Sequence, residues 1–493
     1  MNKVSEPLYL AAQVREGERQ AAAQLGIEMF ELMERAGLAV YQLFLERYSD
    51  SQNVLVICGG GNNGGDGYIF ARLAKGDGYN VTLWQSGKAE NLTGDAAAAR
   101  DKWLADGGNI QPPESSVPEG THVIIDALLG TGLHGAVRPD AEDLISIVNE
   151  SDKPVISVDS PSGLHSDSGA ILGSCIRAEQ TVTFIARKQG LYTGEASSVT
   201  GEVIFAGLGV SEQFHKNTQP SSTTLSLQQL ISALKARGKT SHKGDFGRVV
   251  LMGGDRGMFG AIRLASEACA RTGAGLTRVV TQLENVSAIV SARPELMVYD
   301  WRGNSNEINN HLHWADVIAL GPGMGTTSWA RSLLGYSNSV EKPIVLDADG
   351  LNLLAKSPDF NSRRIITPHP GEAARLLNCS IDEVEQDRFS AVKRLQRKYG
   401  GVAVLKGAGT LVFDGKHHYL CTAGNPGMAT GGMGDVLTGV IAGLLGQGLS
   451  LTDAACGGVW MHSTAADMCA AEQGQNGMLA SDLFPYLRKL VNQ

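Results

Sequence analysis

Short apolar runs that end in glycine or aspartate, each followed by a helical pattern, recur along the chain and constrain its fold more than any other feature. This alternation is typical of parallel α/β units, whose strands are buried on both faces. A polar segment without periodicity, residues 215–224, separates two series of such runs and is the expected linker. We therefore expect two α/β domains, at 1–217 and 225–493. The predicted strands are 54–58, 81–84, 123–126, 154–159 and 181–185 in the first domain, and 248–253, 276–281, 317–321, 343–347, 364–367 and 402–406 in the second.

Charge and cysteine content exclude several classes of protein. The formal net charge of -9 argues against general affinity for nucleic acid or anionic membranes, so an anionic ligand must be met by local donors. The 7 cysteines are scattered without a C-x-x-C pair, which disfavours a disulfide framework or a zinc site and fits a reducing compartment. No run reaches the ~18 apolar residues of a membrane span, and residues 11–48 have the spacing of two amphipathic helices. We expect a soluble cytoplasmic protein.

Glycine is unusually frequent, with 61 of 493 residues, and it gathers in loops that follow strands. Ligands of open α/β sheets bind at such loops, beyond the carboxyl ends of the strands. Residues 59–67 satisfy the G-x-G-x-x-G dinucleotide pattern between a strand and a helix expected to begin near Tyr68. The next strand ends at 83–86 without an acidic residue to hold a ribose, which disfavours an ordinary NAD-dependent dehydrogenase.

Two further strand ends of the first domain carry aspartates. Asp126 leads into a second glycine-rich loop, and Asp159 leads into Ser160-Pro161-Ser162-Gly163. The oxygens of Asn63, Asp126 and Ser162 suit an alkali or alkaline-earth ion, whereas Asp159 can serve as an acid/base group. Alternatively, both aspartates are helix N-caps.

In this order, segments 59–67, 126–133 and 159–164 resemble the NAD(P)H-hydrate epimerases, which invert the hydroxylated carbon of damaged, hydrated NADH or NADPH. That carbon is bonded to the ring nitrogen, whose lone pair can help expel the hydroxyl or open the ring, and proton transfers then complete the inversion. The resemblance implies a Rossmann-like three-layer αβα domain, Asp159 as the acid/base group, and K⁺ held by Asn63, Asp126 and Ser162. It also implies substrate contacts from Asn62, Asn63, Gly64, Gly65, Asp66, Gly130, Thr131, Gly132, Leu133, His134, Gly135, Ala136 and Asp159.

In the second domain, a glycine run ends in Asp435 and is followed by an apolar helical stretch, 436–449. Glycines and the N–H groups that open a helix can cradle an anion. An aspartate there would repel phosphate, but it is well placed to take a proton from a hydroxyl that attacks a phosphoryl group. This is the logic of a small-molecule kinase; the alternative is a glycine-rich turn with Asp435 as a helix N-cap.

Segment 367–377 resembles the strand end of the ribokinase superfamily where an asparagine and a glutamate organise magnesium and phosphate. His369 stands in place of the asparagine, and Glu372 is retained. This departure fits the ADP-dependent NAD(P)H-hydrate dehydratases, which segments 241–244, 321–325, 406–410 and 431–435 also resemble. The resemblance implies a ribokinase-like domain, Mg²⁺ and ADP as co-substrate. It implies hydrate contacts from Ala261, Gly323, His369, Glu372 and Asp435, and nucleotide contacts from Lys406, Gly407, Ala408, Gly409, Thr410 and Gly434.

Together the two resemblances cover nearly the whole chain and predict a bifunctional nicotinamide nucleotide repair enzyme. An epimerase would interconvert R and S hydrates, and a dehydratase would restore NAD(P)H from the S form at the expense of ADP, giving AMP and phosphate. The expected partners are hydrated NADH or NADPH and ADP, in a homo-oligomer without nucleic acid or membrane. The alternatives are a vitamin or sugar kinase with an accessory ligand-binding domain, and a first domain that senses a ligand without catalysis.

Overall fold

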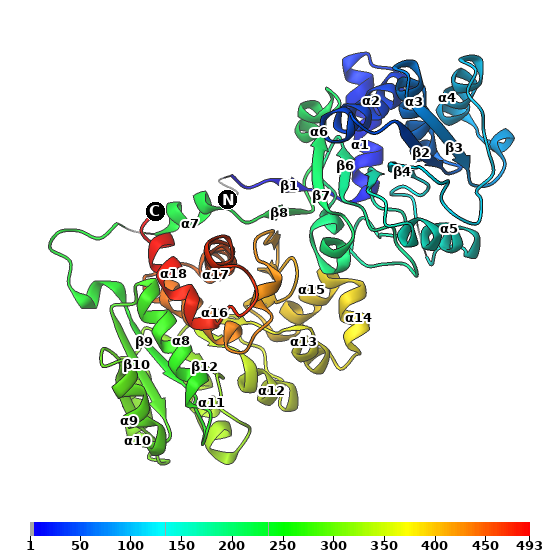
Figure 1. Ribbon diagram of the computed structural model, residues 1–493. Coiled ribbons are helices and arrows are strands. Elements are labelled where there is room, and N and C mark those ends of the chain that lie inside the picture. The colour runs from blue at the N-terminus through cyan, green and yellow to red at the C-terminus, as the bar shows by residue number, and fades with distance from the viewer. Residues whose placement is uncertain (1–3, 134, 235) are drawn as a thin grey trace. The chain divides into compact units, whose positions relative to one another are not determined.

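The computed structural model describes residues 4–133, 135–234 and 236–493 (Figure 1). The chain forms two compact units, Pro7–Ser222 and Thr223–Gln493, and residues 4–6 belong to the second unit. The backbone N–H of Glu6 donates to Thr224 Oγ1, and the N–H of Thr224 donates to the carbonyl of Glu6, both at 2.9 Å. Among the described helices, none has the length and apolar character to cross a membrane.

The first unit is built on a parallel sheet with the strand order β3-β2-β4-β5-β6-β7. Its strands are β2 (Asn53–Cys58), β3 (Asn80–Gln85), β4 (Val123–Ala127), β5 (Val155–Val158), β6 (Gln180–Phe184) and β7 (Glu202–Ala206). Its helices are α1 (Ala11–Leu25), α2 (Met29–Tyr48), α3 (Asn62–Gly76), α4 (Gly94–Ala105), α5 (Pro139–Glu150) and α6 (Ser211–Asn217).

Different helices cover the two faces of this sheet. Val54 and Val56 of β2 share a buried cluster with residues of α2 and α3, whereas Leu55 and Ile57 share another with residues of α5. Because successive side chains of a strand point to opposite faces, the sheet is the middle one of three layers. The three-layer αβα arrangement predicted for the first half is confirmed.

In the second unit the strand order from β8 is β8-β17-β16-β15-β14-β13-β12-β9-β10-β11. The strands from β15 to β11 pair in parallel, and β16 and β17 add an antiparallel edge. The strands are β8 (Ser222–Thr224), β9 (Arg248–Met252), β10 (Leu276–Thr281), β11 (Met297–Asp300), β12 (Val317–Leu320), β13 (Ile344–Leu346), β14 (Arg364–Ile366), β15 (Val402–Leu405), β16 (Leu411–Phe413) and β17 (His418–Leu420). The principal helices are α8 (Phe259–Thr272), α9 (Leu283–Ala292), α10 (Ser305–Trp314), α11 (Ser328–Asn338), α12 (Ala348–Lys356), α13 (Pro370–Leu377), α15 (Arg388–Tyr399), α16 (Met433–Gly446), α17 (Leu451–Gln473) and α18 (Phe484–Leu490).

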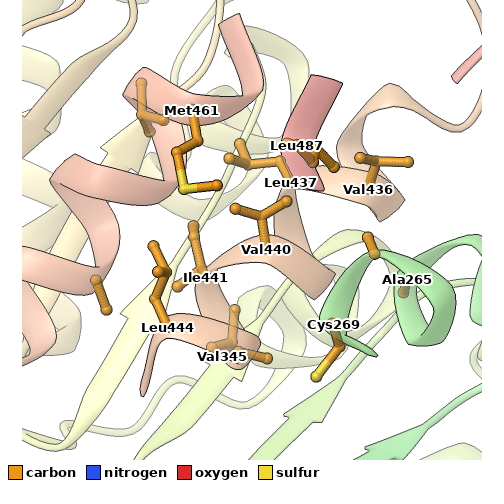
Figure 2. Packing of buried hydrophobic residues seen from close by; sticks show 14 of the residues in the cluster. Ala265, Cys269, Val345, Val436, Leu437, Val440, Ile441, Leu444, Met461 and Leu487 are labelled. Atoms are coloured by element: carbon orange, nitrogen blue, oxygen red, sulfur yellow. The ribbon is translucent and has the colours of Figure 1, made fainter. Parts of the chain in front are cut away.

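Helix α16 occupies the centre of the apolar core of this unit. Its Val440 and Leu444 belong to one buried cluster with Val345 of β13 and with residues of α8 and α17 (Figure 2). Gly439 allows α16 to approach α8 closely, because a Cβ at this position would lie 1.9 Å from the carbonyl oxygen of Ala265. This packing fixes the first turn of α16, which carries the predicted Asp435.

The expected strands are all present, and so are the two helices expected within 11–48, but three details differ from expectation. Strands β7, β11, β16 and β17 were not expected. The expected linker, 215–224, completes α6 and contains β8. Helix α3 begins at Asn62 and not near Tyr68, so the glycines that follow Asn63 lie inside a helix.

Candidate functional site

The first unit has a cleft of about 760 Å³ beside the ends of β2 and β4. Strand β2 pairs with β3 on one side and with β4 on the other, so the strand order reverses at this place, as it does at ligand sites of open α/β sheets. The polar and charged side chains that line the cleft are Arg15, Glu18, Arg19, Asn62, Asn63, Asp66, Asp95, Thr131, Arg138, Asp159 and Lys188.

Most of the predicted substrate contacts of the first unit line this cleft, namely Asn62, Asn63, Asp66, Gly130, Thr131, Gly132, Leu133, Ala136 and Asp159. Gly64 and Gly65 do not line it. A Cβ at Gly64 would lie 2.2 Å from the carbonyl oxygen of Gly59, and one at Gly65 would lie 2.6 Å from Met33. These two glycines therefore let α3 pack closely against its neighbours. Gly135 is exposed outside the lining, and His134 lies outside the described residues.

Asp159 is held in position by its backbone and by a buried lysine. It has a φ of +63°, unusual for a residue other than glycine, which follows from the turn that ends β5. Its carboxylate accepts a hydrogen bond from the backbone N–H of Phe184 at 3.1 Å and forms an ion pair with Lys188. The Lys188 side chain is 2% exposed and also donates to the carbonyl of Phe184 at 3.0 Å. The ammonium group thus stabilises negative charge on Asp159.

Two further carboxyl groups lie in the same electrostatic environment. The pKa of Glu18 is raised to about 7, mainly by burial. The negative charge of Asp159 adds to this increase, and the positive charge of Lys188 opposes it. Burial also raises the pKa of Asp66 well above its usual range, and Asp159 and Glu18 add to this effect. The cleft therefore contains two carboxyl groups whose pKa is raised by burial, a property that suits general acids near neutral pH.

Asp126 and Ser162 do not line the cleft but lie next to its wall. Asp126 is 1% exposed and accepts hydrogen bonds from the hydroxyl of Ser157 at 2.8 Å and from the N–H of Ser162 at 2.9 Å. The hydroxyl of Ser162 in turn accepts from the N–H of Leu129, a residue of the cleft, at 2.8 Å. Burial raises the pKa of Asp126, and these hydrogen bonds lower it in part. Neither aspartate is a helix N-cap, so the alternative reading of Asp126 and Asp159 is wrong.

The same region contains an amide without a partner. The buried side-chain nitrogen of Asn63 makes no hydrogen bond in the described part of the chain. A Cβ on Gly130 would lie 3.0 Å from the Asn63 side chain, so this amide is next to the loop that follows Leu129. A half-turn of the side-chain amide exchanges its O and N, so Asn63 can present its oxygen here. Oxygen donors near a buried carboxylate fit a hard monovalent cation.

In the second unit, Asp435 is the third residue of α16, whose N-cap is Gly432 with a φ of +92°. Asp435 is therefore not the N-cap itself, which excludes the simple capping alternative. Burial raises the pKa of Asp435 to about 7, and Asp347 raises it while Lys406 lowers it. A carboxyl group with this pKa can act as a general base near neutral pH.

Lys406 is the cation at the centre of this site. Its ammonium donates to Asp347 at 2.8 Å and lies 3.8 Å from Glu372. Burial acts to lower the pKa of Lys406, but Asp347, Glu372 and Asp435 together raise it. Asp347 also accepts a hydrogen bond from Thr438 of α16 at 2.8 Å, so it connects β13, β15 and α16.

The His369–Glu372 turn forms a capping box at the start of α13. The Glu372 carboxylate accepts the backbone N–H of His369 at 2.8 Å, and His369 Nδ1 accepts the N–H of Gly371 at 3.1 Å. Burial lowers the pKa of His369, and Lys406 lowers it further. His369 is therefore neutral near pH 7, consistent with hydrogen bonding and not with binding phosphate as a cation.

Three further predicted residues of this unit are Ala261 of α8, Gly434 of α16 and Gly323 in the loop after β12. A Cβ on Gly323 would lie 3.2 Å from Ala261, so these two predicted residues are neighbours. Two positions later, the N–H of Gly325 donates to Asp349, which acts electrostatically on Asp435. A Cβ on Gly434 would lie 3.2 Å from the Lys406 ammonium.

The predicted nucleotide loop is tied to a neighbouring helix. Arg388 of α15 donates to the carbonyl oxygen of Lys406 at 3.0 Å, and a Cβ on Gly407 would lie 2.8 Å from the Arg388 guanidinium. The hydroxyl of Thr410 donates to the carbonyl of Gly407 at 2.9 Å, and Gly409 has a φ of +64°. Ala408 lies between Gly407 and Gly409 in the same turn.

Sequence reasoning did not select Glu18, Lys188, Asp347 and Asp349 as site residues. Asp347 ends a predicted strand, as Asp126 and Asp159 do, so the same rule could have found it. Glu18 and Lys188 had no comparable signal, since they reach the cleft through tertiary packing.

Comparisons with known proteins agree with this division. Residues 29–190 match the family model described as YjeF-related protein N-terminus, and residues 249–489 match the model described as NAD(P)H-hydrate dehydratase. Proteins described as bifunctional NAD(P)H-hydrate repair enzymes are similar over almost the whole chain. The one from Vibrio cholerae is 49% identical over 98% of each chain, and the one from Escherichia coli is 49% identical over 100% of this chain and 95% of its own. A solved ribokinase-like superfamily protein from Enterococcus faecalis is 33% identical, with a TM-score of 0.51, covering 55% of this chain and 95% of its own.

Proposed function

The chain belongs to the family of bifunctional NAD(P)H-hydrate repair enzymes, and we propose that its two units divide the repair between an epimerase cleft and a dehydratase site. The first unit interconverts the R and S hydrates of NADH and NADPH. The second unit dehydrates the S hydrate to NAD(P)H. The observation that carries this proposal is that each unit places a partly buried aspartate near a lysine. Asp159 forms an ion pair with Lys188, and Asp435, in the first turn of α16, interacts electrostatically with Lys406, which pairs with Asp347.

In the first unit, Asp159 is the proposed acid/base residue. Its carboxylate is held at the cleft by the ion pair with Lys188 and can accept a proton during inversion. Arg15, Arg19 and Arg138 also line the cleft and supply positive charge in a chain whose net charge is -9. These side chains are suited to the pyrophosphate of a dinucleotide.

Asn63, Asp126 and Ser162 are the proposed K⁺ ligands. The buried carboxylate of Asp126 accepts hydrogen bonds from Ser157 and Ser162, and no cationic side chain of the described residues forms an ion pair with it. A bound K⁺ would supply that charge and would fix the loop of Leu129 and Gly130, which forms part of the substrate cleft.

In the second unit, Asp435 is the proposed general base that deprotonates the hydroxyl of the hydrate. Hydroxide is a poor leaving group, so phosphoryl transfer from ADP to this oxygen allows phosphate to leave instead. Lys406, close to Gly434 and to Asp435, is placed to stabilise the charge that develops on the transferred group. Mg²⁺ would accompany the phosphates of ADP near Glu372, and the segment from Gly407 to Thr410 is the proposed nucleotide loop.

The proposal is tested with resolved R and S hydrates, in the presence of Mg²⁺ and either ADP, ATP or no nucleotide. Full recovery of reduced-nicotinamide absorbance from a mixture of both epimers is expected with ADP. Recovery that stops at the S fraction would exclude an epimerase, and no recovery with any nucleotide would exclude the repair function.

Paired variants test the separation of the two sites. Asp435→Asn should abolish dehydration and leave epimerisation intact, whereas Asp159→Asn should do the reverse. Asp382→Asn and Asp143→Asn, both at exposed positions, are matched controls that should retain both activities. Loss of both activities in either site variant would contradict two independent sites.

A further inference from the structure

One face of α1 forms part of the epimerase cleft. Ala11, Val14, Arg15, Glu18 and Arg19 all line it, at the spacing of three and four residues that brings side chains to one side of a helix. The helix is fixed in place at both ends of this face: the N–H of Ala11 donates to Asp167 at 2.7 Å, and Gly17 contacts Phe214 of α6. Glu18 is therefore presented to the cleft by a packed helix and not by a mobile loop.

Glu18 has the surroundings of a proton donor. Its carboxyl group makes no hydrogen bond to any described residue, so its oxygens remain available to a ligand. Burial raises its pKa to about 7, and the charged groups that act on it are Lys188, Asp159, Arg19 and Arg15. Asp66, on α3, belongs to the same group of charges. At neutral pH, Glu18 is therefore protonated in a substantial fraction of molecules, while the nearby Asp159 is paired with Lys188.

We propose that Glu18 is a second acid/base residue of the epimerase, working with Asp159 across the hydroxylated carbon of the bound hydrate. This inference rests on the proposed role of Asp159 and adds the partner that the reaction requires. Inversion at a carbon needs a proton donor for the group that leaves one face and a proton acceptor for the group that arrives at the other.

The reaction then proceeds by exchange of water. The lone pair of the ring nitrogen forms a C=N bond as the C–O bond breaks, and Glu18 gives its proton to the departing hydroxyl, which leaves as water. A water molecule attacks the opposite face of the planar iminium carbon and loses a proton to Asp159, and the C=N electrons return to nitrogen. The opposite epimer reacts by the same steps with Asp159 as donor and Glu18 as acceptor. Proton exchange with water in the cleft restores the starting state.

In this scheme the active form of the enzyme carries one proton on the pair of carboxyl groups formed by Glu18 and Asp159. Asp66 is less suited to the role of donor, since it lies in the second turn of α3, beside glycines that pack against neighbouring segments. Glu18, by contrast, lies on the face of α1 that lines the cleft together with Asp159.

The test compares the full-length protein with Glu18→Gln, Asp159→Asn and the control Glu16→Gln, an exposed neighbour on the same helix. Epimerisation of pure R hydrate is followed by chromatography without ADP, so that dehydration does not occur. Glu18→Gln should lower the epimerisation rate by roughly 10²-fold or more, and Glu16→Gln should not. Dehydration of S hydrate with ADP, measured on the same samples, should be unchanged in all variants.

The pH profile and the source of the oxygen complete the test. The wild-type rate should fall as pH rises above about 7, where Glu18 loses its proton, and this decrease should be absent in Glu18→Gln. In H₂¹⁸O, the product epimer should contain ¹⁸O. A wild-type rate in Glu18→Gln, an unchanged pH profile, or retention of the original oxygen would each overturn the proposal. Retained epimerisation in Asp159→Asn would instead refute the proposed function of Asp159.

Discussion

Asp435 illustrates how burial and neighbouring carboxylates can set the working pH of a proposed general base. Its pKa is raised to about 7 by burial and then by Asp347, and Asp349 also raises it. A general base acts in its ionised form, so the dehydration rate should rise with pH and level off above about 7. Asp349→Asn removes one negative neighbour and should move the midpoint to lower pH. Initial rates of NAD(P)H release from S hydrate, measured across this range, test both statements; a rate that falls with pH would contradict them.

The Lys406–Asp347 pair predicts a separation of stability from activity. The Asp347 side chain is 2% exposed, so Lys406→Met leaves a buried carboxylate without its cation and should destabilise the second unit by about 3–5 kcal/mol. Adding Asp347→Asn removes the unpaired charge and should recover most of this stability, because the amide oxygen can still accept from Thr438. Dehydration should remain lost in the double variant. Urea denaturation measures the first effect, and recovery of activity in the double variant would contradict the second.

At the scale of single residues, the sequence predicted chemistry where a strand ends in an acid or a glycine. Asp126 and Asp159 follow this rule, whereas Asp435 was selected from a glycine run before a helix. All three could be found because their places depend on the chain nearby. Lys188 could not be found in this way, since its partner Asp159 lies 29 residues earlier in the chain, and their contact depends on the packing of β5 beside β6. The roles of Gly64 and Gly65 were also hidden, because only tertiary structure reveals what a Cβ would meet there.

At the scale of elements, the contact between α16 and α8 limits which residues position 439 can accept. A Cβ at Gly439 would lie 1.9 Å from the Ala265 carbonyl oxygen, so Gly439→Ala should push the helices apart and lower the unfolding free energy by at least 1–3 kcal/mol, about the cost of overpacking a core. Gly335→Ala on α11 is the matched control. Its Cβ would meet nothing within 4 Å, so the higher helix propensity of alanine should stabilise the protein by up to about 1 kcal/mol. Thermal denaturation of both variants decides whether packing or propensity controls these positions.

Two of the strands that the sequence did not predict, β7 and β11, share a physical reason. Central parallel strands such as β2 and β4 are continuous apolar runs because both of their faces are buried. Strands β7 and β11 are at sheet edges and are only partly buried, so their apolar pattern is weaker. Helix α3 begins earlier than expected because its glycines, which usually disfavour helix, are stabilised by tertiary contacts.

At the scale of the whole molecule, each unit has its own apolar core. The clusters of the first unit and the large cluster around α16 share no residue. Each unit also holds its own proposed active site, composed of residues from that unit alone. The two activities should therefore respond separately to substitutions, ligands and denaturants.

Ligand binding should thus stabilise only the unit that binds. ADP with Mg²⁺ at about 100 times its Kd should add ~2.7 kcal/mol to the unfolding free energy of the second unit and leave the first unchanged. Replacing Na⁺ by K⁺ should stabilise the first unit alone, and Asp126→Asn should remove this effect because it neutralises the carboxylate proposed to bind the ion. Calorimetric scans of the full-length protein should resolve two transitions that move independently. A single transition, or a K⁺ effect that persists in Asp126→Asn, would contradict the assignment of one ligand set to each unit.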